Sequence, residues 1–100
     1  MNVTIESSGC VVIAYLIGEI DHHTAGDVRE KIDNTLMFKK PNTLILDFKN
    51  VSFMDSSGIG LVMGRYRLLQ GFSATLEIRN VTASTKKIME LAGLGSIAII

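Results

Sequence analysis

Two short, almost continuous apolar runs, at residues 11–17 and 43–48, constrain the fold of this chain more than any other feature. The first run is rich in β-branched residues, which is typical of a strand covered on both faces, as in parallel sheets, and the second is expected to be the next buried strand. Between them, apolar residues recur at spacings of three or four and predict a helix that starts near residues 22–24. Its apolar positions are Ala25, Val28, Ile32 and Leu36. Strand, helix and strand in this order predict a right-handed crossover between parallel strands.

The rest of the chain extends this alternation. Further strands are expected at residues 3–6, 74–78 and 97–100, a loop at 49–54, and helices from 56 or 57 to 69 and from 82 onward. Gly71 and Gly93 are placed to end these two helices, and Ile88, Leu91 and Ala92 are expected to face inward on the second. The order β-β-α-β-α-β-α-β predicts one α/β domain over residues 1–100, with helices packed against a mixed, mostly parallel sheet whose first strand is an antiparallel edge.

Composition excludes several classes of partner. Ten basic residues balance ten acidic ones, so the chain has no global field to hold nucleic acid or an anionic membrane. No apolar stretch approaches the roughly 18 residues of a membrane-spanning helix, and the N-terminus lacks the features of a signal peptide. A cytoplasmic location is therefore expected. Cys10, the only cysteine, lies in the apolar run of residues 10–17 and is expected to be a buried, inert thiol.

The segment from Met54 to Ile59, with the sequence MDSSGI, concentrates the chemistry of the chain. It places Asp55, Ser56 and Ser57 where a strand ends and a helix begins, at unpaired backbone N–H groups that favour negative charge. One serine suffices as the helix N-cap, and a phosphate on the other would be tolerated by the helix dipole. The glycines that follow, at positions 58, 60 and 64, each cost about 1 kcal/mol in a helix relative to Ala. This cost indicates that the helix backbone is left without side chains at these positions so that another molecule can approach it closely.

A second polar segment, DHHT at positions 21–24, follows the preceding strand of the predicted sheet. Loops after parallel strands lie on the same rim, so Asp21, His22 and Thr24 are expected near Asp55 and Ser56. Phe53 and Met54 precede the serines and are candidate apolar contact anchors. Arg65 is expected to face solvent or to pair with a carboxylate.

Enzymatic chemistry is weakly supported by these residues. A nucleophile elbow needs a glycine two residues before the serine, and none is present at Ser56. A phosphate-binding loop needs a Gly-Lys-Ser/Thr ending, which the glycine-rich segment lacks. Adjacent histidines rarely bind one metal, and no further ligands follow at a zinc-like spacing, so no metal site is expected.

Three segments, GEIDHHTA at 18–25, FMDSSGIG at 53–60 and MGRY at 63–66, resemble the anti-anti-sigma factors of the STAS domain family. The resemblance runs in order along nearly the whole chain and is closest to the sporulation-type antagonists of anti-sigma F factors in endospore-forming bacteria. It implies a non-enzymatic regulator that binds an anti-sigma factor with serine kinase activity and thereby releases the sigma factor.

The same resemblance implies a switch. The kinase phosphorylates Ser56, with Ser57 as the second candidate, and the modified protein then dissociates from its partner until a serine phosphatase restores it. Ser57 is then expected to be a helix cap. ATP and Mg²⁺ come from the kinase, so the chain needs no cofactor of its own. The implied contact surface comprises Asp21, His22, Thr24, Met54, Asp55, Ser57, Gly58 and Ile59.

Alternatives stay open at this point: an antagonist in stress signalling, a STAS domain detached from an anion transporter, and a weak nucleotide-binding regulator or hydrolase. Family members usually continue beyond the position of Ile100, so either a C-terminal extension is missing here or the native chain is compact.

Overall fold

A computed structural model describes residues 2–100 of the chain as one sheet with helices. The strands are β1 (Asn2–Ser8), β2 (Val11–Ile20), β3 (Thr43–Met54) and β4 (Thr75–Arg79). The helices are α1 (Ala25–Lys39), α2 (Ser56–Gln70) and α3 (Ala83–Leu91), followed by a 3₁₀ helix, η1 (Leu94–Ser96).

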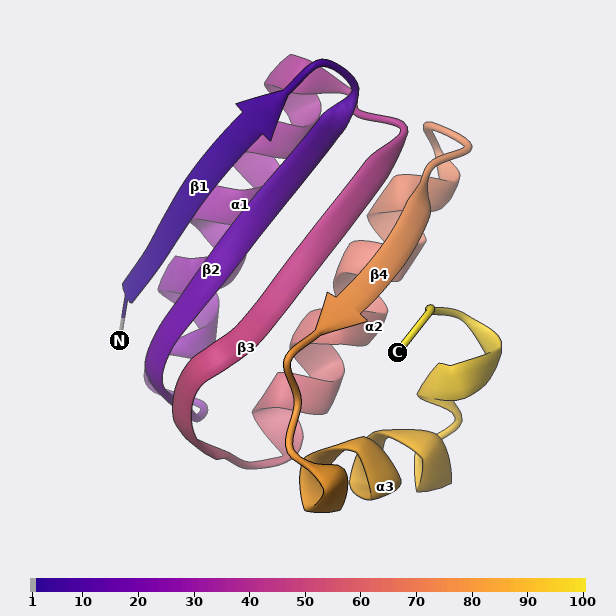
Figure 1. Ribbon diagram of the computed structural model, residues 1–100. Helices are drawn as coiled ribbons and strands as arrows, with labels where there is room; N and C mark the ends of the chain where they lie inside the picture. The colour runs from indigo at the N-terminus through magenta and orange to yellow at the C-terminus, as the bar shows by residue number, and fades with distance from the viewer. Residues whose placement is uncertain (1) are drawn as a thin grey trace.

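The sheet has the strand order β1-β2-β3-β4. β1 pairs with β2 antiparallel, and β2, β3 and β4 are mutually parallel. Figure 1 shows the carboxyl ends of these three parallel strands together at the lower end of the molecule, where α3 also lies. This arrangement confirms the predicted α/β fold and its antiparallel edge strand.

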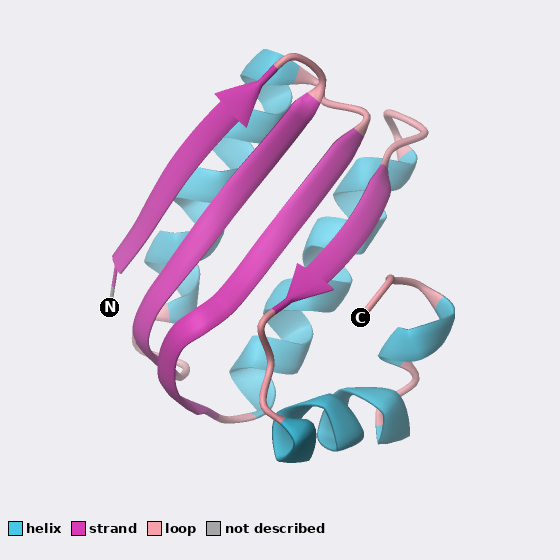
Figure 2. Cartoon of the chain, viewed as in Figure 1, coloured by secondary structure: helices cyan, strands magenta, loops and turns pink. Residues whose placement is uncertain are grey.

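Both long helices, α1 and α2, lie on one face of the sheet, as the colours of Figure 2 make clear. The core lies between that face and the helices, where alternate residues of β2 (Val12, Ala14 and Leu16) are buried. On the opposite face, Ile13 and Tyr15 are half-buried and Ile17 is exposed. The prediction that the strand at residues 11–17 would be covered on both faces is therefore wrong, because both long crossover helices pack on the same face of the sheet (Figure 2).

The expected loop at 49–54 is a continuation of β3, which pairs with β2 as far as Ile20 and Met54. Two register shifts occur on the way, between Tyr15 and Ile17 and between Gly18 and Glu19. Gly18 has φ +95°, a conformation that glycine adopts without strain. Such irregularities bend a strand and increase its twist, and here they occur shortly before the rim.

The expected final strand at 97–100 is reduced to a single parallel bridge between Ile99 and Glu77. The amides of Ile97 and Ala98 donate to the carbonyl of Leu94 and are held in the turn after η1. Only Ile99 is left to pair with β4. Its amide donates to Leu76, and its carbonyl accepts from Ile78.

Cys10 is exposed, contrary to the expected buried thiol. It lies in the turn between β1 and β2, where its carbonyl accepts the amides of Asn42 and Thr43 at 2.7 and 3.3 Å. The apolar run that seemed to include it begins one residue later, with the first residue of β2.

Candidate functional site

The two polar segments singled out in the sequence are neighbours on the carboxyl rim of the sheet. β2 ends at Ile20 and β3 at Met54, and these two residues are partners in the parallel register. The amide of Asp55 donates to the carbonyl of Ile20 at 3.1 Å, so a backbone hydrogen bond joins the two segments directly. The prediction of a common rim is confirmed.

Asp55 is the N-cap of α2. Its backbone is extended (φ −102°, ψ −165°), and its side chain accepts a hydrogen bond from the Ser57 amide at 2.8 Å. The prediction that Ser56 or Ser57 would cap this helix is wrong, because the carboxylate one residue earlier already accepts the first-turn amide. Both serine hydroxyls are thus free of the capping role.

The two serines point to different surroundings. Ser56 is exposed and lines a hollow of about 310 Å³ between α2 and α3. Ser57 is half-buried and lines a groove of similar volume between α1 and α2. Of the two hydroxyls, the Ser56 hydroxyl is therefore the more accessible to another protein.

The turn before α1 is built by Asp21 and Thr24. The Asp21 carboxylate accepts the amides of His23 and Thr24 at 2.8 and 3.1 Å, and these bonds, that of His23 first, lower the pKa of Asp21. The Thr24 hydroxyl accepts from the Asp21 amide and donates to the carbonyl of Glu19. These two side chains fix the loop, whereas His22 and His23 are exposed, with ring centroids 3.9 Å apart.

Gly58 leaves room for a side chain of the same molecule. It is buried in the first turn of α2, and a Cβ there would overlap Cγ and Sδ of Met54. The sequence predicted that another molecule would approach the glycine backbone here, but the Met54 side chain fills the space next to Gly58. Gly60 and Gly64 differ, since an added Cβ would contact nothing within 4 Å at either position. They line the groove between α1 and α2.

Arg65 joins these two helices from inside. It is 5% exposed, and its Nε lies 2.7 Å from Oδ1 of Asp33 on α1. Of the two predicted environments, solvent or a carboxylate partner, the structure shows the second. Burial lowers the pKa of Arg65 and raises that of Asp33, against the opposing effect of their mutual attraction.

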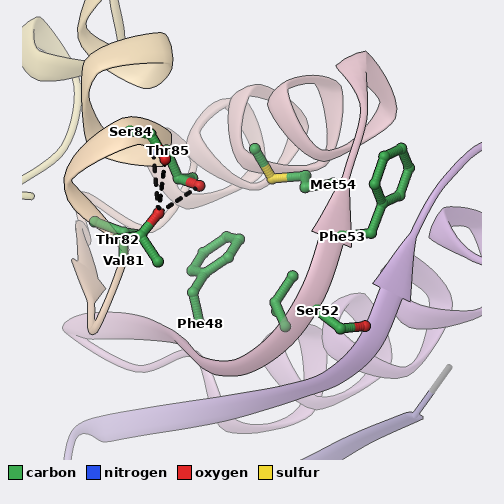
Figure 3. Close-up of a pocket in the computed structure, with 9 residues that line it drawn as sticks. Phe48, Ser52, Phe53, Met54, Val81, Thr82, Ser84 and Thr85 are labelled. Atoms are coloured by element: carbon green, nitrogen blue, oxygen red, sulfur yellow. Dashed lines mark hydrogen bonds between the residues drawn. The ribbon is translucent and has the colours of Figure 1, made fainter.

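A second hollow, of about 240 Å³, lies between the end of β3 and the start of α3. Figure 3 shows the side chain of Met54 directed into it, toward Thr85, and that of Phe53 directed away. Thr82, the N-cap of α3, accepts the Thr85 amide and shares hydrogen bonds with the hydroxyls of Ser84 and Thr85. The polar wall of this hollow is therefore largely satisfied by the helix cap itself.

The inward face of α3 differs from the prediction. Met89 is fully buried, whereas Ile88 and Leu91 are 56% and 80% exposed, and Ala92 is also exposed. Ile88 and Thr85 line the hollow beside Ser56, and sequence reasoning missed both as site residues. The available signal was the apolar pair Ile88 and Leu91, one turn apart, which was assigned to the core.

Other kinds of site are not seen in the part of the chain that the structure describes. Across residues 2–100, no three His, Cys, Asp or Glu side chains gather as a metal site requires. None of the helices among these residues has the length and apolar character needed to cross a membrane.

The structure places an exposed serine at the capped start of a helix, beside the polar turn that follows β2. The two polar sequence segments predicted this arrangement. Residues 2–99 of this chain match the sequence model of the STAS domain family. The protein belongs to the STAS domain family.

Relatives of known role are similar over most of this STAS domain. The anti-sigma F factor antagonist of Paenibacillus polymyxa is 32% identical over 94 residues, which cover 94% of this chain and 80% of that protein. The corresponding antagonist of Lysinibacillus sphaericus is 37% identical over 84 residues, 84% of this chain and 72% of that protein.

Solved structures agree. The anti-sigma factor antagonist SpoIIAA in its unphosphorylated form superposes with a TM-score of 0.84 at 33% identity, covering 98% of this chain and 86% of that one. Its phosphorylated form, from Bacillus, gives a TM-score of 0.78, with 98% and 89% covered. These comparisons confirm the family resemblance and support the predicted function of an anti-sigma factor antagonist.

Proposed function

We propose that this protein is an anti-sigma factor antagonist that acts as a binding protein, not as an enzyme. Its unmodified form binds an anti-sigma factor with serine kinase activity through the carboxyl rim of the sheet, and the sigma factor is released. Phosphorylation of Ser56 switches the binding off. The observation that carries the proposal is the exposed hydroxyl of Ser56 at the start of α2, beside a cap and a turn that are already hydrogen-bonded.

The modification is a phosphoryl transfer from ATP to the Ser56 hydroxyl. A bond forms between the serine oxygen and the γ-phosphorus, the bond to the β-phosphate oxygen breaks, ADP leaves, and the hydroxyl proton passes to a base of the kinase. ATP and Mg²⁺ belong to the kinase. A serine phosphatase reverses the change by transferring the phosphoryl group to water, which returns the hydroxyl and inorganic phosphate.

Phosphate at this position changes the surface more than the fold. It adds about −1.5 to −2 charges at neutral pH, which the N-terminal end of α2 tolerates because the helix dipole favours negative charge there. In a complex, the same dianion would be desolvated beside the carboxylate of Asp55. Repulsion and lost hydration both oppose rebinding, which is what an off-switch requires.

The proposed contact surface follows the rim. Exposed groups on it are His22 and Ser56, and the half-buried ones are Asp21, Thr24, Met54, Asp55, Ser57 and Ile59. Gly58 is buried beneath Met54, so we assign its contribution to positioning that side chain. Asp21 and Thr24 shape the turn that presents His22.

The test uses the anti-sigma factor encoded in the same genome, with ATP and Mg²⁺, and mass spectrometry to locate the phosphoserine. We expect modification at Ser56. Ser56→Ala should bind as the unmodified protein does and resist phosphorylation, Ser56→Asp should bind poorly, and Ser57→Ala is the matched control that is still modified. Modification confined to Ser57, or a complex undiminished by phosphorylation, would overturn the proposal.

A further inference from the structure

Helix α3 presents an apolar face that nothing in the described chain covers. Ile88 and Leu91 lie one turn apart and are 56% and 80% exposed, while Met89 between them is fully buried. The helix is therefore anchored to the core by one face and leaves two large aliphatic side chains on another. Exposed apolar groups gathered beside a hollow are typical of a contact surface.

The hollow next to this face is the one that contains Ser56. Its walls are mainly apolar, from Met54, Ile59 and Ile88, and its polar groups come from Asp55, Ser56 and Thr85. It shares Met54 and Thr85 with the second hollow, the one drawn in Figure 3. We call the hollow between Ser56 and Ile88 the α2–α3 cleft.

Met54 gives the cleft an adaptable wall. Its side chain packs over the bare backbone of Gly58 and is directed toward Thr85 (Figure 3). Methionine is unbranched and polarizable and fills irregular gaps, so it can adjust to an inserted group. The volume of about 310 Å³ is at the lower end of small-molecule sites, and few polar groups converge on it. An apolar side chain suits such a cleft better than a polar ligand.

We propose that the α2–α3 cleft receives a large aliphatic or aromatic side chain of the anti-sigma factor, with Ile88 as its principal contact. This inference rests on the proposed function, because it concerns the partner that approaches Ser56. Ser56 itself lines the cleft, so a protein that encloses this serine also covers the cleft. The contact surface therefore extends from the rim onto α3, beyond the segments that the sequence singled out.

The cleft also supplies a reason for release. A phosphate on Ser56 would lie at the edge of an apolar cavity that is closed by the partner's side chain. The dianion would lose hydration without gaining a counter-charge from the cleft walls, where the one ionisable neighbour lining the cavity is the carboxylate of Asp55. A phosphate already attached to Ser56 and an inserted apolar group therefore oppose each other, so the partner docks before the transfer and is released after it.

The test compares Ile88→Ala with Phe38→Ala, a matched truncation of an exposed apolar residue. Phe38 is 82% exposed near the end of α1, away from the rim. Binding of the unphosphorylated full chain to the anti-sigma factor from the same genome is measured by titration calorimetry. We expect Ile88→Ala to weaken binding about tenfold, as for a buried interface anchor, and Phe38→Ala to leave it within about twofold.

Phosphorylation by the same partner gives a second readout. Ile88→Ala should raise the KM for the chain as a substrate and leave kcat nearly unchanged, because Ile88 helps docking and does not touch the transferred phosphoryl group. If Ile88→Ala lowers the melting temperature, the test is repeated with Ile88→Cys in a Cys10→Ser background. The maleimide reactivity of that cysteine should then fall when the complex forms.

The outcomes separate the two proposals. Unchanged affinity and KM for Ile88→Ala, or undiminished maleimide labelling in the complex, would overturn the cleft assignment while Ser56→Asp still loses binding. If Ser56→Asp also binds normally, the proposed function fails with it. Equal losses for Ile88→Ala and Phe38→Ala would show a non-specific effect of exposed apolar groups and would likewise overturn the assignment.

Discussion

The glycines of α2 should respond to alanine in opposite directions. At Gly60 and Gly64 an added Cβ meets no atom within 4 Å, and neither residue has a positive φ. At Gly58 the added Cβ overlaps Cγ and Sδ of the Met54 side chain. We therefore expect Gly60→Ala and Gly64→Ala to stabilise the fold and Gly58→Ala to leave it unchanged or weaken it.

The magnitudes follow from helix propensity and packing. Alanine is favoured over glycine inside a helix by about 0.8–1.0 kcal/mol, which at Gly60 and Gly64 is opposed by no clash. In a domain of this size, 1 kcal/mol raises the melting temperature by roughly 4–8 °C. Overpacking typically costs about 1–3 kcal/mol, so the net change at Gly58 is a loss of roughly 0–2 kcal/mol.

The assay is urea unfolding of the three single variants and the wild type, followed by circular dichroism. A gain at Gly58 equal to that at Gly60 would refute the argument that Met54 occupies the space above Gly58. A loss at both Gly60 and Gly64 would refute the open groove between α1 and α2. Affinity for the anti-sigma factor is measured on the same variants, since a more stable variant that binds less would show that these glycines are kept for the partner's approach.

Three further perturbations address the cap, the buried ion pair and the rim turn. Asp55→Ala removes the acceptor of the Ser57 amide and should lower the free energy of unfolding by about 1 kcal/mol in urea. Asp33→Ala leaves the buried guanidinium of Arg65 unpaired and should lower the free energy of unfolding by about 2–3 kcal/mol. The double variant Asp33→Ala/Arg65→Met contains no buried charge at this position and should lose less. Equal losses of stability in the two variants would contradict this expectation. The Asp21 pKa lies below its ordinary value of 3.8, so the carboxylate contributes stability above that pH and loses it as the pH falls through the lower, folded value. Stability measured from pH 5 to 2 should accordingly fall less steeply for Asp21→Asn, and identical slopes would show that the turn does not depend on this charge.

The sequence was sufficient to predict the parallel pairing of β2 and β3 and the shared edge at which both strands end. The apolar runs of β2 and β3, with one amphipathic helix between them, leave few alternatives to a right-handed crossover, and this places Asp21 and Asp55 on the same edge of the sheet. The extension of β3 to Met54 was missed because residues 49–52 are mostly polar. Their strand conformation comes from pairing with β2 beyond its register shifts, which is not encoded in the local pattern.

The candidate site was predicted only in part, because a local sequence pattern does not show tertiary contacts. Helical spacing identifies Ile88 and Leu91 as a face of α3 but does not say whether that face meets the core or another protein. The cap of α2 was predicted to be a serine, but Asp is as good an N-cap as Ser, and the extended backbone of Asp55 makes that residue the cap. The burial of Arg65 depends on Asp33 of a different helix, a pairing that a single sequence does not reveal.

The hydrogen bond from the Asp55 amide to the carbonyl of Ile20 has a consequence for how a partner would recognise the proposed switch. It ties the neighbour of Ser56 to an adjacent strand, so a kinase that acts on Ser56 as proposed would meet a surface that is already ordered in the folded protein. The entropy cost of ordering that surface is then met during folding and not during association. Recognition of this kind depends on shape contributed by distant parts of the chain. An isolated peptide with the MDSSGI sequence would carry the proposed acceptor serine but little of the surrounding surface that a partner recognises.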